Sequence, residues 1–223
     1  MPVRFIFFDL GNVLFRFSSE LMLGRVAGVV GCLVGDVYRL IYEDGWEYKL
    51  ETGKATEQEF FDAIYAKFGC NFDRTKLADA FNDIFTEIIE TRSFLEYLSS
   101  ISFPCGILSN TSLSHWNHIV SKYPYLIKLI PCNYAFSFEC GSMKPERVIF
   151  EYAMNIAQKA VGGEKKLEAC EILFIDDLAK NIEGAINFGF DAIQFTNWKH
   201  VEIELKKRRF LSLDFAEFQA RTI

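Results

Sequence analysis

The chain lacks an excess of basic residues, and this argues against a nucleic-acid partner. Its formal net charge is −6 over 223 residues, so it does not supply the clustered Lys and Arg side chains that bind backbone phosphates. The one dense basic run, Lys206 to Arg209, is interpreted as the exposed end of a helix, where cations interact favourably with the helix dipole.

Long apolar runs are also missing. Phe5 to Phe8 meets Asp9 at once, and Ala27 to Gly35 is far shorter than the roughly 20 residues that cross a bilayer. Neither stretch predicts a secretory leader or a membrane span, because a leader also needs a longer apolar core and a cleavage site of small residues. We therefore expect a cytoplasmic protein with no membrane partner.

The third missing feature is a paired-cysteine motif. The six cysteines are Cys32, Cys70, Cys105, Cys132, Cys140 and Cys170. They contain no Cys-x-x-Cys pair and no nearby histidine set, so neither a zinc site nor a disulfide framework is predicted. Buried free thiols are expected instead.

What the chain does have is enough apolar sequence for a substantial core, since 50% of its residues are hydrophobic. Short apolar runs ending in polar residues predict strands. These runs are Arg4 to Asp9, Cys105 to Asn110, Tyr134 to Phe138, Glu171 to Asp176 and Asp191 to Phe195. Helix-length segments, such as Pro145 to Ala160 and Leu178 to Phe188, separate most of them. This alternation predicts an α/β fold with a doubly wound parallel sheet covered by helices on both faces.

The interval between the first two predicted strands is several times longer than the later ones, which indicates an insertion. Residues from Phe15 to Thr91 are predicted to be wholly helical. Asp36 to Tyr48 is amphipathic, Thr56 to Glu59 forms a capping box, and one face of a further helix is expected from spacing. That face comprises Leu77, Phe81, Ile84, Phe85 and Ile88. The domains are therefore expected to be a core, residues 1–15 and 92–223, and a small helical cap, residues 16–91.

Polar residues stand at the predicted carboxyl ends of the strands, where parallel sheets bind their ligands. They are Asp9, Ser109 and Asn110, Lys144 in a following loop, and Asp176 with Asp177. Each is also common at such a place without any function, because Asp and Ser often cap the next helix and a lone Lys is usually solvated. Together they offer a carboxylate nucleophile, a hydroxyl and amide pair, a cation and an acidic pair for a hard metal.

The order of four segments strengthens this interpretation. Phe-Phe-Asp-Leu-Gly-Asn-Val-Leu begins at residue 7, Leu-Ser-Asn-Thr at 108, Met-Lys-Pro at 143, and Phe-Ile-Asp-Asp-x-x-x-Asn-Ile-Glu-Gly-Ala at 174. This set resembles the haloacid dehalogenase-like (HAD) hydrolase superfamily over nearly the whole chain. The insertion is similar to the small helical cap of that superfamily. The Asp-Leu-Gly-Asn-Val variant most resembles the subgroup that includes bacterial glucose-1-phosphate phosphatases.

The resemblance implies a role for each residue in phosphoryl transfer. Asp9 is expected to attack phosphorus and form an aspartyl phosphate that water then hydrolyses. Ser109 and the backbone amide of Asn110 are expected to hold the phosphoryl oxygens, and Lys144 to neutralise them.

The resemblance also implies a Mg²⁺ cofactor, held by the Asp9 carboxylate, the Gly11 carbonyl and Asp176. Asp177 is either a further ligand, through water, or a group that orients Lys144. Asn181 is expected to support the segment that holds Asp176 and Asp177. His115 is interpreted as a helix-face histidine with a local hydrogen bond.

Gly11 is a departure from the family pattern, which places there a second aspartate that protonates the leaving oxygen. Such a group typically contributes about two to four orders of magnitude in rate. Without it, a sugar 1-phosphate suits the site better than a simple alkyl phosphate, and a phosphomutase is disfavoured. A cap carboxylate is an alternative acid, although a solvated helix face is the favoured interpretation of the candidates. These are Glu43, Asp44, Glu47 and Glu51.

The expected function is Mg²⁺-dependent hydrolysis of a small phosphorylated metabolite, a sugar phosphate in particular. The alternative is a regulatory protein that binds phosphate and metal with weak or no turnover because of Gly11. A dehalogenase is disfavoured by the acidic pair Asp176 and Asp177. A phosphonatase needs a cap lysine, for which Lys49 and Lys54 are available without a motif that singles out either.

Overall fold

A five-stranded parallel sheet forms the centre of the protein in the computed structural model, which describes residues 2–69, 71–163 and 166–210. The strand order is β5-β4-β1-β6-β7. The strands are β1 (Phe5–Phe8), β4 (Cys105–Ser109), β5 (Tyr134–Phe136), β6 (Ile172–Asp176) and β7 (Asp191–Gln194). All four neighbouring pairs are parallel, so the predicted α/β class is confirmed. Each strand begins and ends at its predicted residue or one or two residues inside it.

The two faces of this sheet bury different side chains of the same strand. In β1, Phe5 and Phe7 belong to one apolar cluster, whereas Ile6 and Phe8 belong to the other. Every residue of β1 is buried. A central parallel strand is covered on both faces, which is why its sequence is a continuous apolar run and not an alternating one.

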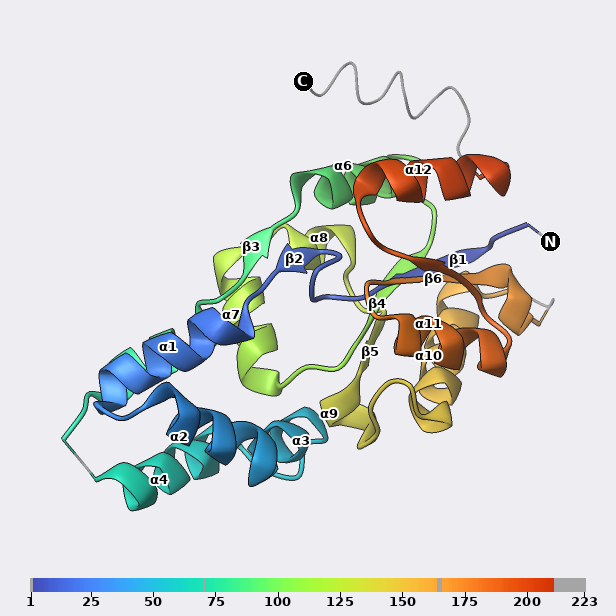
Figure 1. The fold of residues 1–223 in the computed structure, drawn as a ribbon. Coiled ribbons are helices and arrows are strands. Elements are labelled where there is room, and N and C mark those ends of the chain that lie inside the picture. The colour runs from blue at the N-terminus through green and yellow to red at the C-terminus, as the bar shows by residue number, and fades with distance from the viewer. Residues whose placement is uncertain (1, 70, 164–165, 211–223) are drawn as a thin grey trace.

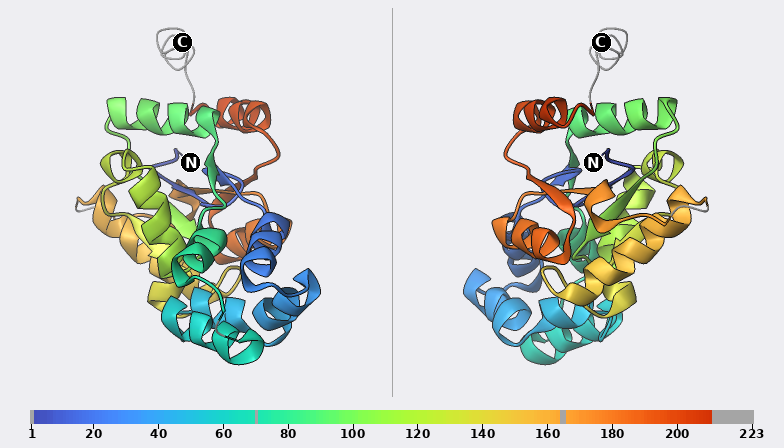
Figure 2. Two further views of the ribbon diagram at one scale, coloured as in Figure 1. Left: turned by 90° about the vertical axis from the view of Figure 1, so that its left-hand side faces the viewer. Right: turned by 90° about the vertical axis from the view of Figure 1, so that its right-hand side faces the viewer.

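Helices cover both faces, as Figures 1 and 2 show. On the Phe5 and Phe7 face lie α10 (Arg147–Val161) and α11 (Ala179–Phe188). The other face is covered by α6 (Ile89–Ser100), α7 (Leu113–Lys122) and α12 (Trp198–Lys207). Short helices α8 (Leu126–Leu129) and α9 (Ser137–Cys140) and a 3₁₀ turn (Ala169–Glu171) complete the connections. The doubly wound arrangement is therefore confirmed.

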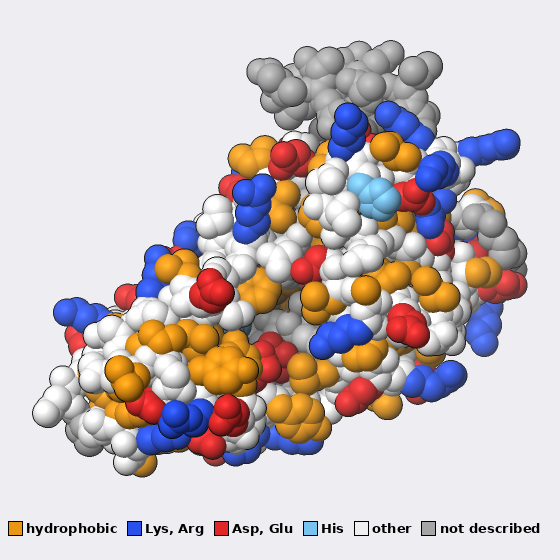
Figure 3. All heavy atoms as spheres, viewed as in Figure 1, with side chains coloured by type: hydrophobic (Ala, Val, Ile, Leu, Met, Phe, Trp, Pro, Cys, Tyr) orange, Lys and Arg blue, Asp and Glu red, His pale blue; other side chains and the backbone are white. Residues whose placement is uncertain are grey.

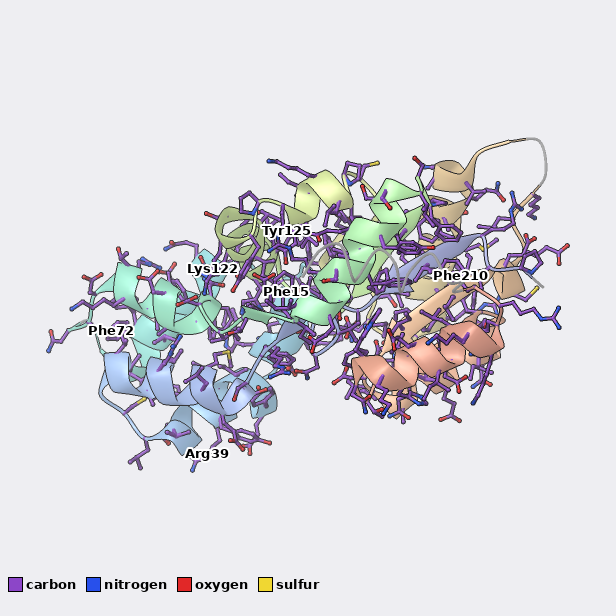
Figure 4. All side chains as sticks on the ribbon, turned by 90° about the horizontal axis from the view of Figure 1, so that it is seen from above. Phe15, Arg39, Phe72, Lys122, Tyr125 and Phe210 are labelled. Atoms are coloured by element: carbon purple, nitrogen blue, oxygen red, sulfur yellow. The ribbon has the colours of Figure 1, made fainter. Side chains whose placement is uncertain are left out.

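A separate group of helices stands between β1 and β4 in the chain, at the end of the molecule away from α6 and α12 (Figure 1). They are α1 (Ser19–Val30), α2 (Val34–Tyr38), a π-helical turn (Arg39–Glu43), α3 (Trp46–Glu51), α4 (Glu57–Phe68) and α5 (Arg74–Asn82). Figure 4 marks this group by Arg39 and Phe72, far from Phe210 at the end of the sheet-bearing part. The predicted capping box is present, with the Thr56 amide donating to Glu59 at 2.8 Å.

The prediction that Phe15 to Thr91 is wholly helical is wrong at both ends. A short strand, β2 (Phe15–Arg16), pairs antiparallel with β3 (Thr86–Glu87), so two extended segments join the helices to the sheet-bearing part. The helix predicted through Ile88 ends at Asn82. Ile84, Phe85 and Ile88 are nevertheless buried, because tertiary contacts require apolar residues there whatever the backbone conformation.

The helix predicted over Asp36 to Tyr48 is also interrupted. Gly45 adopts a left-handed conformation, with φ of 77°, and begins α3 as a new helix. Glycine takes this conformation without the steric cost that a side chain brings. After this break, α3 packs against α9.

The cysteine and membrane predictions have mixed outcomes. Cys105 is buried, and Cys32 and Cys140 are partly buried. Cys132 and Cys170 are exposed, so the prediction of buried thiols is wrong for these two; Cys70 lies outside the described residues.

Among the described residues, no single helix is long and apolar enough to cross a membrane. One pair bent by 112°, Ser19–Val30 with Val34–Glu43, meets those limits only when both helices are taken together.

Candidate active site

Lys144 lies at the centre of a buried group of charges. Its Nζ is 2.8 Å from Asp9 Oδ1 and 2.6 Å from Asp176 Oδ2, and it donates a hydrogen bond to the Leu108 carbonyl at 3.1 Å. Asp9 follows β1 and Asp176 ends β6, and these two strands are neighbours in the sheet. The structure therefore brings together three of the residues that the sequence places at separate strand ends.

Ser109 and Asn110 complete the group from the other side of β1. Ser109 ends β4 and is buried, and its hydroxyl donates to the Asn110 carbonyl at 3.3 Å. Its interaction with Asp9 opposes the rise in the pKa of that carboxyl. The Asn110 side chain donates to the Lys144 carbonyl at 3.1 Å and accepts from the Lys144 amide at 2.7 Å. This reciprocal pair holds the loop that carries Lys144, a role of the Asn110 side chain that the sequence did not indicate.

Three carboxylates gather around Lys144 and could hold a metal ion. Asp9, Asp176 and Asp177 each offer one oxygen, and these oxygens lie within 4.8 Å of one another. When ionised, they carry three negative charges against one ammonium, so two charges need a divalent cation or protons. Carboxylate oxygens are the ligands that Mg²⁺ prefers, and the residues present therefore fit this ion.

Neighbouring amides fix the acidic side chains. Asn181 Nδ2 is 3.0 Å from both oxygens of Asp176, as expected for its supporting position. Asn12 Nδ2 donates to Asp177 Oδ2 at 3.1 Å. The sequence analysis did not identify Asn12 as a site residue. Its φ of 54° is the left-handed conformation, which Asn tolerates better than most residues, so the Gly11-Asn12 pair is the signal that could have indicated it.

The electrostatics of the group favour one protonation pattern. Burial raises the pKa of Asp9 to about 6, an effect that Lys144 opposes. Burial alone lowers the pKa of Lys144, but the charges of Asp9 and Asp176 outweigh it and the net shift is upward. Lys144 is therefore an ammonium at neutral pH, placed beside a carboxylate that burial makes more basic than a surface aspartate.

A cavity of about 120 Å³ lies next to this group, between the helices of residues 19–82 and the carboxyl ends of β1 and β4. Figure 3 shows the surface hollowed between these two parts. Gly11, Ser109 and Asn110 line it from the sheet, and the helical side contributes mostly apolar residues together with Glu47 and Glu51. A small ligand in this cavity would contact both parts of the molecule.

Solved structures of HAD enzymes share the architecture. One from Bacteroides thetaiotaomicron is 22% identical and superposes with a TM-score of 0.76, over 90% of this chain and 98% of that chain. The structure of a predicted HAD-like family hydrolase from Porphyromonas gingivalis gives 23% identity and a TM-score of 0.71, over 92% of this chain and 98% of that chain. The fold is that of the HAD family. A haloacid dehalogenase from Xanthobacter autotrophicus is more distant, with 17% identity and a TM-score of 0.56, over 98% and 87%.

The sequence comparisons reach a smaller part of the HAD-fold chain. An uncharacterized hydrolase of Schizosaccharomyces pombe is 39% identical over 89 residues, which are 39% of this chain and 36% of that protein. No protein-family model matches the chain.

Gly11 stands where the resembled family has a second aspartate. A Cβ atom built on Gly11 would lie 2.9 Å from Cε1 and 3.1 Å from Cδ1 of Phe17, so the ring fills the space that an aspartate side chain would enter. The absence of a carboxylate here is therefore matched by the packing of its neighbour.

His115 lies on the cavity wall and has a structural environment. Its Nε2 is 3.3 Å from the Phe81 carbonyl, and its ring stacks on Phe81 with centroids 4.7 Å apart. Burial lowers the pKa of His115 to about 4. The imidazole is thus neutral at physiological pH. Its hydrogen bond is not the local one that was predicted, because Phe81 belongs to α5, 34 residues away in the sequence.

Proposed function

We propose that the protein is a Mg²⁺-dependent phosphatase that hydrolyses a small phosphorylated metabolite through an aspartyl phosphate on Asp9. The observation that carries this proposal is the buried contact of Lys144 with both Asp9 and Asp176, next to a cavity lined by Gly11 and Ser109. Support also comes from the Bacteroides thetaiotaomicron enzyme of the same fold, which was crystallised with magnesium and inorganic phosphate.

In the proposed reaction the Asp9 carboxylate attacks phosphorus, and the ester oxygen leaves. Lys144 keeps Asp9 ionised and oriented, since it contacts Oδ1 at 2.8 Å. Ser109 and the Asn110 amide bind the phosphoryl oxygens at the edge of the cavity. Phosphoryl transfer depends mainly on such positioning and charge neutralisation.

The metal would be held by Asp9, the Gly11 carbonyl and Asp176, with Asp177 as a further or indirect ligand. Magnesium supplies positive charge that offsets the anionic substrate and the three carboxylates. Asn12 and Asn181 keep Asp177 and Asp176 in place through the hydrogen bonds already described.

For the substrate we propose a sugar phosphate, as in the subgroup of glucose-1-phosphate phosphatases that the first motif resembles. The cavity is small, at about 120 Å³, and its carboxylates and hydroxyls can accept hydrogen bonds from sugar hydroxyls. Residues 16–91 are proposed to act as the cap that selects this leaving group. A cytoplasmic location agrees with the free thiols of Cys32, Cys105, Cys132 and Cys140.

The test is turnover of p-nitrophenyl phosphate and a panel of sugar phosphates, with Mg²⁺ and with EDTA. We expect Mg²⁺-dependent release of phosphate that Asp9→Asn abolishes. Turnover that survives Asp9→Asn would contradict the mechanism. Stabilisation by Mg²⁺ and phosphate without any turnover would favour the alternative, a binding protein. The observation that supports this alternative is that Phe17 fills the space beside Gly11, where the acid of the family would lie.

A further inference from the structure

Glu51 is the last residue of α3 and lines the same cavity as Gly11 and Ser109. It comes from the helices that face the strand ends across this cavity, and its charge interacts with those of Asp9 and Lys144. Within the described part of the chain, its carboxyl makes no side-chain hydrogen bond and no ion pair. An unpaired carboxyl in a largely apolar cavity destabilises the fold. Such a group is therefore a candidate for a functional role.

The backbone around Glu51 is held firmly against the sheet-bearing part. The Thr52 hydroxyl donates to the Tyr48 carbonyl at 2.6 Å, which closes the last turn of α3. Gly53 has φ of 66° and approaches Phe138 of α9 so closely that a Cβ atom there would overlap the Phe138 carbonyl. Glu51 is therefore positioned by a fixed contact between the two parts and does not lie on a solvated helix face.

We propose that Glu51 is the general acid and base of the reaction, in place of the carboxyl that position 11 lacks. This inference rests on the proposed phosphatase function. Phe17 fills the space beside Gly11, whereas the cavity leaves Glu51 free to reach a ligand.

The surroundings of Glu51 favour its protonated form at neutral pH. Burial and the neighbouring Glu47 raise the pKa of Glu51 to about 8, and Asp9 adds to this effect, while Lys144 and Lys180 oppose it. His115, across the cavity, is neutral because burial lowers its pKa to about 4. A carboxylic acid that holds its proton near pH 7 is suited to protonate a leaving oxygen.

The proton balance of the step is complete without another reactant. As Asp9 forms its bond to phosphorus, the bond from phosphorus to the ester oxygen breaks, and that oxygen takes the proton of Glu51 to leave as an alcohol. The Glu51 carboxylate then removes a proton from the water that attacks the aspartyl phosphate. Phosphate departs from Asp9, and Glu51 is protonated again.

The experiment compares two substrates whose leaving groups differ in their need for a proton. Glycerol 2-phosphate releases an alkoxide, which must be protonated, whereas p-nitrophenyl phosphate releases a stabilised phenolate. We expect Glu51→Gln to lower kcat/KM for glycerol 2-phosphate by about 100-fold or more and that for p-nitrophenyl phosphate by less than about threefold. Because kcat/KM reports only the steps through loss of the leaving group, slow dephosphorylation does not mask the difference.

Two further readouts separate chemistry from structure. In wild type, kcat/KM for glycerol 2-phosphate should fall as pH rises above about 8, where Glu51 loses its proton, and Glu51→Gln should remove this fall. The variant should also show a burst of nitrophenol, because the phosphoenzyme accumulates. Glu43→Gln is the control, an exposed carboxylate of the same group of helices that does not line the cavity, and should leave kcat/KM for both substrates unchanged.

Each outcome assigns the failure to one claim. If turnover depends on Asp9 but Glu51→Gln changes both substrates equally, or changes neither, Glu51 is not the acid and only this inference is overturned. If wild-type turnover is absent or insensitive to Asp9→Asn, the phosphatase function is itself overturned.

Discussion

Replacing Lys144 with methionine tests the electrostatic role of this side chain in the site. Lys144 is 3% exposed and contacts Asp9 at 2.8 Å and Asp176 at 2.6 Å. Removing one partner of a buried ion pair typically costs about 3–5 kcal/mol, because the other charge stays buried and unpaired. Domains of this kind unfold with about 5–15 kcal/mol, so the variant should be folded but clearly weakened.

The assay is urea unfolding in EDTA and at increasing Mg²⁺. A divalent cation bound to the same carboxylates replaces part of the lost positive charge, so Mg²⁺ should stabilise Lys144→Met more than wild type. Ligand binding at a hundredfold excess over Kd is worth about 2.7 kcal/mol. Lys122→Met is the control, since Lys122 pairs with Asp83 at the surface and should cost only about 0–1 kcal/mol.

Two results would refute this reasoning. A loss in EDTA no larger than that of Lys122→Met would mean that the carboxylates do not need the ammonium. An equal effect of Mg²⁺ on wild type and Lys144→Met would mean that the ion does not bind to the carboxylates that Lys144 contacts.

Three other predictions concern neighbouring residues. Asn181→Ala removes the donor to Asp176 and should weaken Mg²⁺ binding about 10- to 100-fold by calorimetry. Unfolding free energy should fall as pH drops from 6.5 towards about 4, because the unfolded chain protonates His115 before the folded one does, and His115→Phe should reduce that slope in urea titrations at several pH values. Gly11→Asp alone should not raise alkyl phosphate turnover, whereas Gly11→Asp with Phe17→Ala should; a gain in the single variant would show that the Phe17 ring moves aside freely.

The sheet could be predicted from sequence because its strands are buried on both faces. A short continuous apolar run such as Phe5–Phe8 is typical of a central parallel strand when helix-length segments alternate with such runs along the chain. The short strands Phe15–Arg16 and Thr86–Glu87 could not be predicted, since two residues carry no periodicity and their pairing is set by the chain around them.

The convergence of the site followed from topology. Once Asp9 and Asp176 are placed at the carboxyl ends of parallel strands, neighbouring strands bring them together, and Lys144 then has two partners within reach. What the sequence did not reveal are contacts between distant segments. The Asn110 side chain holds the Lys144 loop, and Phe17 fills the space beside Gly11, but neither contact leaves a local signal.

Glu51 shows the same limit from the opposite direction. In sequence it is one of four cap carboxylates with equal standing, and a solvated helix face is the simplest interpretation of all four. Only the fold shows that Glu51 shares a cavity with Gly11 and Ser109. The position of α3 against α9, which depends on the close approach of Gly53 to Phe138, makes the difference.

The central claim is that Asp9 becomes phosphorylated, and mass spectrometry of an acid-quenched reaction tests it most directly. Wild type is mixed with p-nitrophenyl phosphate and Mg²⁺, quenched during turnover, and digested. We predict that the peptide containing Asp9 gains the mass of one phosphoryl group, more so in Glu51→Gln, and that Asp9→Asn gains none. Steady phosphate release from wild type and Glu51→Gln with no phosphorylated Asp9 in either would contradict this claim.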